Sequence, residues 1–461
     1  MPHTGRKVLV IGLDCATPQL IFDRWVDDLP HFKAILEQSV YGELESTIPP
    51  ITVPAWTSMV SSKSPGVLGF YGFRNRKNYS YDEMYFATSQ AVKEDRVWDI
   101  LSRAGKKSVL VGVPQTYPPK PLNGSMISGF LAPDTNCQYT YPQELKREIE
   151  DVVGEYILDV KKFRTEDKDD LIKQIYDMTE NRFRVVNHLL VNKEWDFFMF
   201  VDMGIDRIHH GLWKYFDEQH RKYEPNSPYK SVLKEYYQYV DSLVGRIVSK
   251  VDERTVIFIV SDHGAQRMDG GICINEWLMR EGYLRLKNPP REVFPLSHDN
   301  IDWPHTKAWG SGGYYGRLFL NVKNREPQGV IEPQDYEKFR DHLITKLEAI
   351  EDENGENINT RVFKPQDIYP QVKNVAPDLI IYFGNLSWRS VGSVGFGDIH
   401  TFENDTGPDD ANHSQYGIFV MKNSGLPRGK VSHLHLMDLA PTILRIFNLP
   451  VPEDMEGKSI I

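Results

Sequence analysis

The sequence has few cysteines, no dense run of lysine and arginine, and no long apolar stretch. The three cysteines, Cys15, Cys137 and Cys273, lie far apart and are odd in number. This pattern argues against a disulfide framework and against a cysteine-based zinc site. A reducing cytoplasm is therefore the expected location.

The acidic balance also limits the partners. With a net charge of -10 and no basic cluster, a long nucleic acid is excluded as a partner on electrostatic grounds. No apolar stretch is long enough to span a bilayer, and the first apolar run is too short for a signal segment and ends at Asp14. A small phosphorylated substrate remains open, because bound metal ions can reverse the local field. Assembly into a homo-oligomer is left open too.

What the sequence does contain is a regular alternation of buried strands and helices. Wholly apolar runs rich in valine and isoleucine are typical of strands covered on both faces. They read "KVLVIGL", "SVLVGV", "DFFMFV", "TVIFIVS", "DLIIYF" and "GIFVM". Helical patterns fall near 30–38, 97–104, 171–192, 230–252, 335–350 and 437–447. The alternation predicts an α/β fold: a doubly wound, mostly parallel sheet flanked by helices.

The 461 residues are enough for one large α/β domain with insertions, or for two domains. We predict a single catalytic domain over residues 1–461. Residues 283–378 follow a less regular pattern, which indicates an insertion or cap within that domain. Its segment 303–315, with Trp309, a glycine-rich turn and two tyrosines, is the predicted specificity region.

Ionisable residues recur where the apolar runs end. Asp14 follows the first run, Asp206 comes shortly after "DFFMFV", and Asp262 and His263 follow "TVIFIVS". Because ligands of open α/β sheets collect at the carboxyl ends of the strands, these side chains are expected to lie close together. Each one alone is also explained as a turn former or helix cap.

Two further histidines extend this set. In "DRIHHGLW", Asp206 and His210 are four residues apart, so a helix places both on one face, where they can bind one ion. His413 precedes the strand "GIFVM". Mixed aspartate and histidine ligation suits zinc, and also manganese or iron, and the set is what two such ions need. It comprises Asp14, Thr52, Asp206, His210, Asp262, His263 and His413.

Thr52 stands in "PPITVPAWTSMVSS" at the mouth of a predicted helix over residues 55–62. The plain interpretation is a helix cap, with Pro54 in the first turn. The alternative is a nucleophile held at the positive end of a helix. The two interpretations are compatible, because metal coordination lowers the pKa of a hydroxyl and the helix end donates to phosphoryl oxygens.

These residues, in this order, resemble the alkaline phosphatase superfamily and, within it, the type I phosphodiesterase and nucleotide pyrophosphatase family. The resemblance runs from "VLVIGLD" to "DLAPTILRIFNLPVPEDMEGKSI". It implies that Asp206, His210 and His413 hold one metal ion, most simply zinc. It implies that Asp14, Asp262 and His263 hold the other, with Thr52 as ligand and nucleophile and with a covalent phosphothreonine as intermediate.

The chain departs from the family pattern after the nucleophile. The family has Phe-Pro-Asn-His where this chain has "VPAW", and it binds a phosphoryl oxygen through an asparagine some twenty residues later. Arg74 and Asn75, in "GFYGFRNRKNYS", are the candidates for that role here. The positive charge of Arg74 favours the binding of a phosphoryl group that is more anionic than a diester. The predicted function is hydrolysis of phosphodiester or pyrophosphate bonds in a small, nucleotide-like substrate, with a phosphomonoesterase or phosphoryl transferase on the same core as the alternative.

Overall fold

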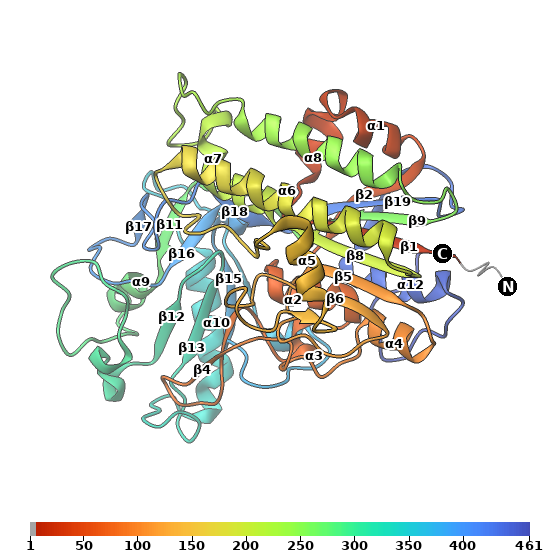
Figure 1. The fold of residues 1–461 in the computed structure, drawn as a ribbon. Helices are drawn as coiled ribbons and strands as arrows, with labels where there is room; N and C mark the ends of the chain where they lie inside the picture. The colour runs from red at the N-terminus through yellow and green to blue at the C-terminus, as the bar shows by residue number, and fades with distance from the viewer. Residues whose placement is uncertain (1–5) are drawn as a thin grey trace.

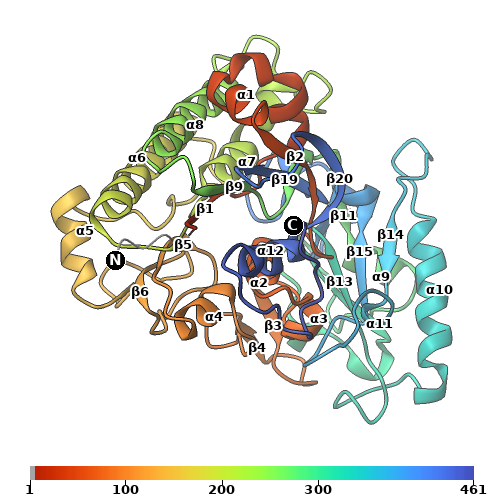
Figure 2. The same cartoon turned by 90° about the vertical axis from the view of Figure 1, so that its right-hand side faces the viewer.

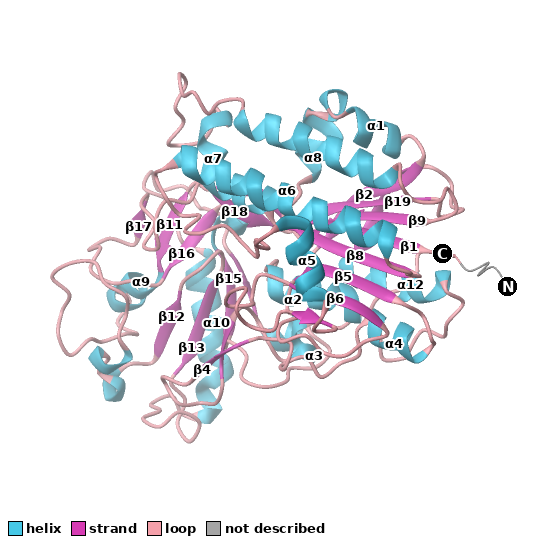
Figure 3. Ribbon diagram, viewed as in Figure 1, coloured by secondary structure: helices cyan, strands magenta, loops and turns pink. Residues whose placement is uncertain are grey.

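The centre of the molecule is a nine-stranded sheet. The computed structural model describes residues 6–461, and in it the sheet order is β20-β2-β19-β9-β1-β8-β5-β6-β7. The bounds, in that order, are Gly429–His435, Ser39–Glu45, Tyr416–Lys422, Val256–Val260, Val8–Leu13, Phe197–Asp202, Ser108–Val113, Gly124–Ser128 and Thr140–Tyr141. Figure 3 shows its strands as one twisted layer between two layers of helices.

The middle of this sheet is parallel. β1 pairs in parallel register with β9 on one side and β8 on the other, and β5 and β6 continue in the same sense. β19 runs antiparallel to both β9 and β2, while β2 and β20 are parallel to each other. The prediction of a mostly parallel sheet flanked by helices is confirmed, with antiparallel pairing towards the two edges.

Each face of the sheet has its own apolar core. Along β1, Leu9 and Ile11 face a cluster shared with the helices that lie above and in front of the sheet in Figure 1. Those helices are α1 (Pro30–Leu36), α5 (Leu145–Val153), α6 (Lys168–Asn192), α7 (Gly204–Phe216) and α8 (Val232–Val248). Val8 and Val10 face a second cluster with α2 (Thr52–Ser61), α4 (Val97–Arg103) and α12 (Leu439–Ile446). Burial on both faces explains why the strands read as continuous apolar runs.

The six helices predicted from the alternation all form, with ends shifted by a few residues, and the predicted helix over residues 55–62 forms as part of α2. The structure has α1, α4, α6, α8, α10 (Tyr336–Glu348) and α12 where the pattern indicated them. Two further short helices, α3 (Pro65–Leu68) and α11 (Pro365–Ile368), begin at a proline, as α1 does. Over residues 6–461 no helix is both long and apolar enough to cross a bilayer.

Residues 283–378 lie mostly in a second body beside the main sheet. Its four-stranded antiparallel sheet has the order β12-β13-β15-β14 (Ala308–Ser311, Gly316–Leu320, Leu379–Tyr382, Arg361–Phe363). α10 packs on this sheet at the right of Figure 2, and α9 (Ile274–Arg280) contacts β12. A three-stranded sheet, β16-β11-β17 (Trp388–Val391, Gly270–Cys273, His400–Thr401), adjoins it. The second body thus begins before residue 283 and continues past 378.

One strand lies in a different sheet from the one predicted. The run "DLIIYF" forms β15, which pairs antiparallel with β13 and β14 and is not part of the nine-stranded sheet. Its residues are as buried as those of the central strands, because α10 and the core around Leu318 and Ile381 cover it. A continuous apolar run indicates that a strand is buried on both faces, but it does not identify the sheet that the strand joins.

Candidate metal centre and active site

The carboxyl ends of three parallel strands converge on one site. Asp14 directly follows β1, and its backbone N–H donates to the carbonyl of Asp202 at the end of β8. Asp262 and His263 follow β9, and α7 begins two residues after β8. The parallel register of these strands therefore brings the polar residues behind them together, as expected from the sequence.

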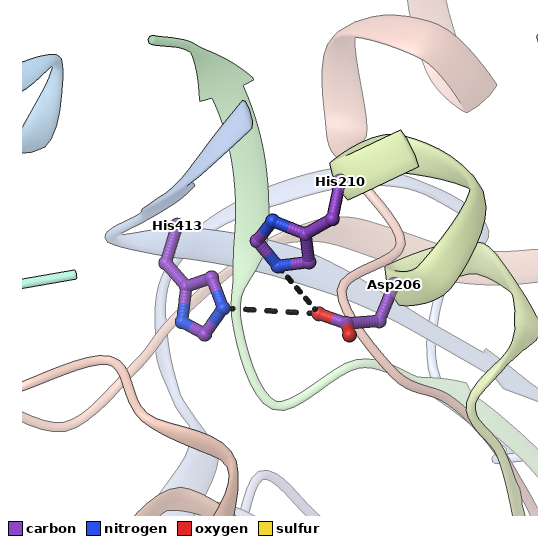
Figure 4. A group of neighbouring side chains, drawn as sticks. All are labelled: Asp206, His210 and His413. Atoms are coloured by element: carbon purple, nitrogen blue, oxygen red, sulfur yellow. Dashed lines mark ion pairs between the residues drawn. The ribbon is translucent and has the colours of Figure 1, made fainter. Parts of the chain in front are cut away.

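The first group of side chains comes from α7 and a short antiparallel ribbon. Asp206 and His210 lie one turn apart on α7, and His413 lies on β18 (Ala411–Ser414), which pairs with β10 (Gly264–Arg267). Figure 4 shows the two imidazoles directed at the same carboxylate. The Nε2 atoms of His210 and His413 lie 3.2 and 3.7 Å from Asp206 Oδ1.

The second group lies beside the first. His263 Nε2 is 3.2 Å from Asp262 Oδ2 and 3.8 Å from Asp14 Oδ1. The rings of His263 and His413 stack with centroids 3.8 Å apart, which joins the two groups. In each group the candidate ligand atoms all lie within 4.8 Å of one another.

Thr52 lies at the edge of the second group. Its Oγ1 is 3.3 Å from His263 Nε2, and the residue is 3 % exposed. Thr52 is the first residue of α2 and Ile51 is the cap, so Thr52 is not the capping residue that the sequence suggested. Ile51 has an extended conformation, and the chain enters α2 directly after it. The Thr52 hydroxyl makes no cap hydrogen bond and faces the site.

The three histidines are held in one orientation by acceptors on the far side of each ring. His210 Nδ1 is 2.7 Å from Asp409 Oδ1, His263 Nδ1 is 3.1 Å from the carbonyl of Gly264, and His413 Nδ1 is 2.8 Å from that of Pro50. An acceptor at Nδ1 selects the tautomer with its proton there and leaves the Nε2 lone pair facing the site.

Four of the buried polar atoms that face the site have no hydrogen-bond partner within residues 6–461. They are Asp14 Oδ1, Asp206 Oδ1, His210 Nε2 and Asp262 Oδ2. Buried oxygen and nitrogen atoms are rarely left unpaired, because doing so costs about 1–3 kcal/mol each. All four belong to the two groups, so the donor set fits divalent cations bound by oxygen and nitrogen.

The carboxylates of the site repel one another. Burial and the neighbouring Asp206 raise the pKa of Asp14 well above its usual value. Burial and Asp14 do the same to Asp262. Burial also acts to raise the pKa of Asp206, but His210 and Arg207 outweigh it and hold that pKa well below the usual value. A cation between the carboxylates would favour their charged forms.

The imidazoles differ according to their partners. Burial lowers the pKa of His263 to about 4, and burial with the facing His263 holds that of His413 well below its usual value. Burial also disfavours charge on His210, but Asp409 and Asp206 overcome it and raise its pKa to about 9.

Two residues that the sequence reasoning missed support the ligands. Trp56, one turn after Thr52 on α2, donates from Nε1 to Asp14 Oδ2 at 2.7 Å. Asp409, whose side chain is buried, orients His210 and also accepts from Arg164 Nε, Arg389 Nη1 and the Tyr314 hydroxyl, at 3.0, 3.2 and 3.2 Å. The position of Trp56, four residues and one helical turn after Thr52, could have indicated that it lies beside the site. The neighbouring sequence "GPDDAN" contains no feature that distinguishes Asp409 from the residues around it.

The two candidates for contact with the phosphoryl group are placed differently. Arg74 is exposed, stacks over Phe86 at 4.9 Å and lies in the wall of the pocket that opens on Thr52. Asn75 is buried: its Oδ1 accepts from the N–H of Tyr71 and its Nδ2 donates to the carbonyl of Gly72. Asn75 therefore stabilises the local turn, and Arg74 is the one that faces the pocket.

A cavity of about 840 Å³ lies over the site, between the main sheet and the second body. Thr52, Asp206 and His413 lie at its floor, and the predicted specificity segment contributes Trp309 and residues 310–315 to its wall. Tyr314 stacks on His210 and His413, with centroids 4.8 and 4.2 Å apart. The volume suits a ligand the size of a nucleotide.

The comparison with known families agrees with this geometry. A model of the type I phosphodiesterase / nucleotide pyrophosphatase family matches residues 8–409. The chain belongs to this family. It is accordingly an enzyme of the phosphodiesterase/nucleotide pyrophosphatase type, and the family hydrolyses phosphoesters with metal ions. His413 lies just beyond the matched range.

Solved structures share the fold over nearly the whole chain. Murine ectonucleotide pyrophosphatase/phosphodiesterase 5, as an inactive threonine-to-alanine variant in complex with AMP, is 13% identical, with 97% of each chain covered and a TM-score of 0.56. Phosphonoacetate hydrolase from Sinorhizobium meliloti 1021, in complex with phosphonoformate, is 15% identical, with 96% of this chain and 95% of that chain covered and a TM-score of 0.61. At these identities the likeness shows the fold alone. No curated protein sequence matches significantly.

Proposed function

We propose that the protein hydrolyses phosphodiester or pyrophosphate bonds of a small, nucleotide-like substrate, with Thr52 as nucleophile and two zinc ions as cofactors, manganese being the alternative metal. The observation that carries the proposal is the position of Thr52 Oγ1, 3.3 Å from His263 Nε2 at the floor of the pocket. Asp206, His210 and His413 would hold one ion, and Asp14, Asp262 and His263 the other.

When bound, the two ions would lower the pKa of the Thr52 hydroxyl and offset the negative charge on the phosphoryl oxygens. Thr52 would lose its hydroxyl proton to solvent and its Oγ1 would attack phosphorus; the bond to the leaving oxygen breaks, that oxygen takes up a proton from solvent, and a phosphothreonine forms. Water then cleaves that ester and restores the hydroxyl. The first amide N–H groups of α2, which begins at Thr52, form the positive end of the helix dipole and would donate to the phosphoryl oxygens.

One related structure and one contact in this chain support Thr52 in this role. The murine neighbour is inactive as a threonine-to-alanine variant and holds AMP. In this chain Thr52 is a buried threonine whose hydroxyl is directed at the candidate metal centre. Of the two substrate-contact candidates, Arg74 fits the role of binding a phosphoryl oxygen, because Asn75 is engaged in its own turn.

The exposed cation at Arg74 favours a second candidate function. A monoester carries one more negative charge than a diester, and an arginine fork in the pocket wall can neutralise it. A phosphomonoesterase, or a phosphoryl transferase on the same core, is therefore the alternative. Under this alternative Arg74→Ala slows turnover of a monoester more than that of a diester.

The test compares initial rates on bis-p-nitrophenyl phosphate and p-nitrophenyl phosphate, with zinc or manganese added and with chelator. Faster diester turnover that chelator abolishes supports the proposal, and faster monoester turnover supports the alternative. Thr52→Ala should retain its fold and both ions and lose turnover by several orders of magnitude, as removal of covalent nucleophiles does elsewhere. Thr52→Ser, which keeps a hydroxyl, is the matched control. Turnover by Thr52→Ala at the unaltered rate removes Thr52 from the mechanism.

A further inference from the structure

Tyr314 connects the second body to the first group of candidate ligands. It lies in the turn between β12 and β13, in the wall of the pocket. Its ring stacks on the imidazoles of His210 and His413, with centroids 4.8 and 4.2 Å apart and ring planes inclined by 19° and 27°. One side chain of the second body therefore contacts two of the three candidate ligands of one ion.

The Tyr314 hydroxyl reaches the same site by a second route. It accepts a hydrogen bond from Arg164 Nη2 at 2.7 Å and donates one to Asp409 Oδ2 at 3.2 Å. The other carboxylate oxygen, Asp409 Oδ1, lies 2.7 Å from His210 Nδ1. Tyr314 thus acts on His210 twice, directly through its ring and indirectly through Asp409.

The backbone of this turn is also held against the site. Asn412, the residue before His413 on β18, donates from Nδ2 to the Tyr314 carbonyl at 3.0 Å. Gly312 packs against the chain that follows β16, where a Cβ at Gly312 would lie 2.5 Å from the nitrogen of Gly392. Since only glycine permits this approach, the glycine-rich turn of the sequence allows Tyr314 to reach the two histidines.

The second group, by contrast, is built without the second body. The sheets of the second body lie within residues 270–401. In the described part of the chain, the side chains of Asp14, Asp262 and His263 make all their hydrogen bonds, ion pairs and ring contacts to residues outside that range. A change at Tyr314 should therefore affect the ion of the first group and leave that of the second.

We propose that Tyr314 is a positioning residue of the metal centre, which the second body supplies to orient His210 and His413 for the ion of the first group. This inference rests on the proposed function and deepens it, because it concerns how the chain holds one of the two ions. Contacts beside and behind a ligand fix the orientation of its ring, and a ligand set that is already oriented loses less entropy when the ion binds. The segment predicted to govern specificity thus also contributes to metal binding.

The experiment measures zinc affinity by competition with a chromogenic chelator in two backgrounds. Asp262→Asn weakens the second group, so the remaining tight ion reports on the first group, and Asp206→Asn does the reverse. We expect Tyr314→Leu, which removes the ring and the hydroxyl, to lower zinc affinity about tenfold in the Asp262→Asn background. In the Asp206→Asn background it should leave zinc affinity unchanged. Tyr314→Phe, which keeps the stacking ring, should show a smaller loss in the Asp262→Asn background.

Tyr315→Leu is the matched control. Tyr315 is the next residue of the same turn, is buried, and donates from its hydroxyl to the carbonyl of Tyr71. Within residues 6–461 it makes no hydrogen bond or ring contact with a candidate ligand. Both leucine variants should lose thermal stability, and only Tyr314→Leu should lose zinc affinity in the first group. If Tyr315→Leu lowers that affinity equally, the effect comes from a loosened second body and the positioning role is wrong.

Two further outcomes would overturn the role of Tyr314. One is unchanged zinc affinity of both Tyr314 variants in the Asp262→Asn background; if Tyr314→Leu does not fold, unchanged affinity of Tyr314→Phe is sufficient. The other is an equal loss of affinity in both backgrounds. None of these measurements depends on turnover. If the protein hydrolyses neither p-nitrophenyl ester, the proposed function fails, and zinc competition still decides whether Tyr314 positions the ligands.

Discussion

The support that Asp409 gives to His210 leads to a quantitative prediction for Asp409→Asn. The Asp409 carboxylate lies behind His210 and accepts from its Nδ1 at 2.7 Å. Two arginines donate to the other oxygen, at 3.0 and 3.2 Å. Asparagine preserves the volume but has one acceptor oxygen and a donor amide, so it cannot accept on both sides at once.

The expected loss has two parts. If the amide faces His210, the Nδ1 proton loses the shorter and charged of its two acceptors and keeps only the carbonyl of Ala411 at 3.1 Å, so the imidazole becomes a weaker and less well oriented ligand. Substitutions of this kind cost about 10–100-fold in metal affinity, or about 1.4–2.7 kcal/mol. If the amide faces the arginines instead, two buried cations lose their counter-ion, and breaking such a pair costs about 3–5 kcal/mol of stability. The neutral side chain also lowers the pKa of His210, because Asp409 is the leading carboxylate that raises it.

The assay is competition for zinc between the protein and a chromogenic chelator, with thermal unfolding measured in parallel. Asp378→Asn is the control: Asp378 is also a buried carboxylate with an arginine, Arg325, at 2.7 Å and the Tyr336 hydroxyl at 2.5 Å, but it contacts none of the candidate ligands. Both variants should lose stability, and only Asp409→Asn should lose zinc affinity. Equal zinc affinity in Asp409→Asn and the unaltered protein would refute the reasoning.

Three further substitutions test the site and its scaffold. Asp262→Asn should weaken binding of one of the two ions, measured by metal titration of the apoprotein, and normal affinity for both would break the ligand assignment. Trp56→Phe removes the donor to Asp14 Oδ2 and should weaken the same ion by about tenfold in that titration, with the buried volume nearly kept. Gly12→Ala should lower the free energy of unfolding by about 1–3 kcal/mol, measured by denaturant titration, because the new Cβ would lie 2.7 Å from the Trp56 ring and 2.9 Å from the carbonyl of Phe200. An unchanged midpoint for Gly12→Ala would show that α2 can move away from β1.

Much of the fold and the core of the site could be predicted because their signals are local. Continuous apolar runs gave the central strands, and the strand ends gave Asp14, Asp262 and His263. A four-residue spacing gave Asp206 and His210. In each case the residue and the element that positions it are neighbours in sequence, so a short window contains the whole argument.

Other features depend on contacts between distant segments. The run "DLIIYF" has the composition of a central strand, yet β15 joins the small sheet because β13 is its partner. Asp409 reaches His210 across nearly two hundred residues. Asn75 matched an expected position in sequence, but the turn that begins at Tyr71 directs its side chain to backbone groups. No single window of sequence contains these pairings.

The same distinction separates chemistry from specificity in this pocket. The candidate nucleophile and most of the candidate ligands follow strands of the central sheet or lie on α2 and α7, and His413 lies on β18 of the short ribbon. Two arginines of the pocket wall, Arg74 and Arg317, come instead from β3 (Arg74–Arg76) and from β13 of the second body, and Arg317 donates to the Arg74 carbonyl. Pocket charge is therefore the property to measure when the substrate is sought, and the metal centre alone does not identify it.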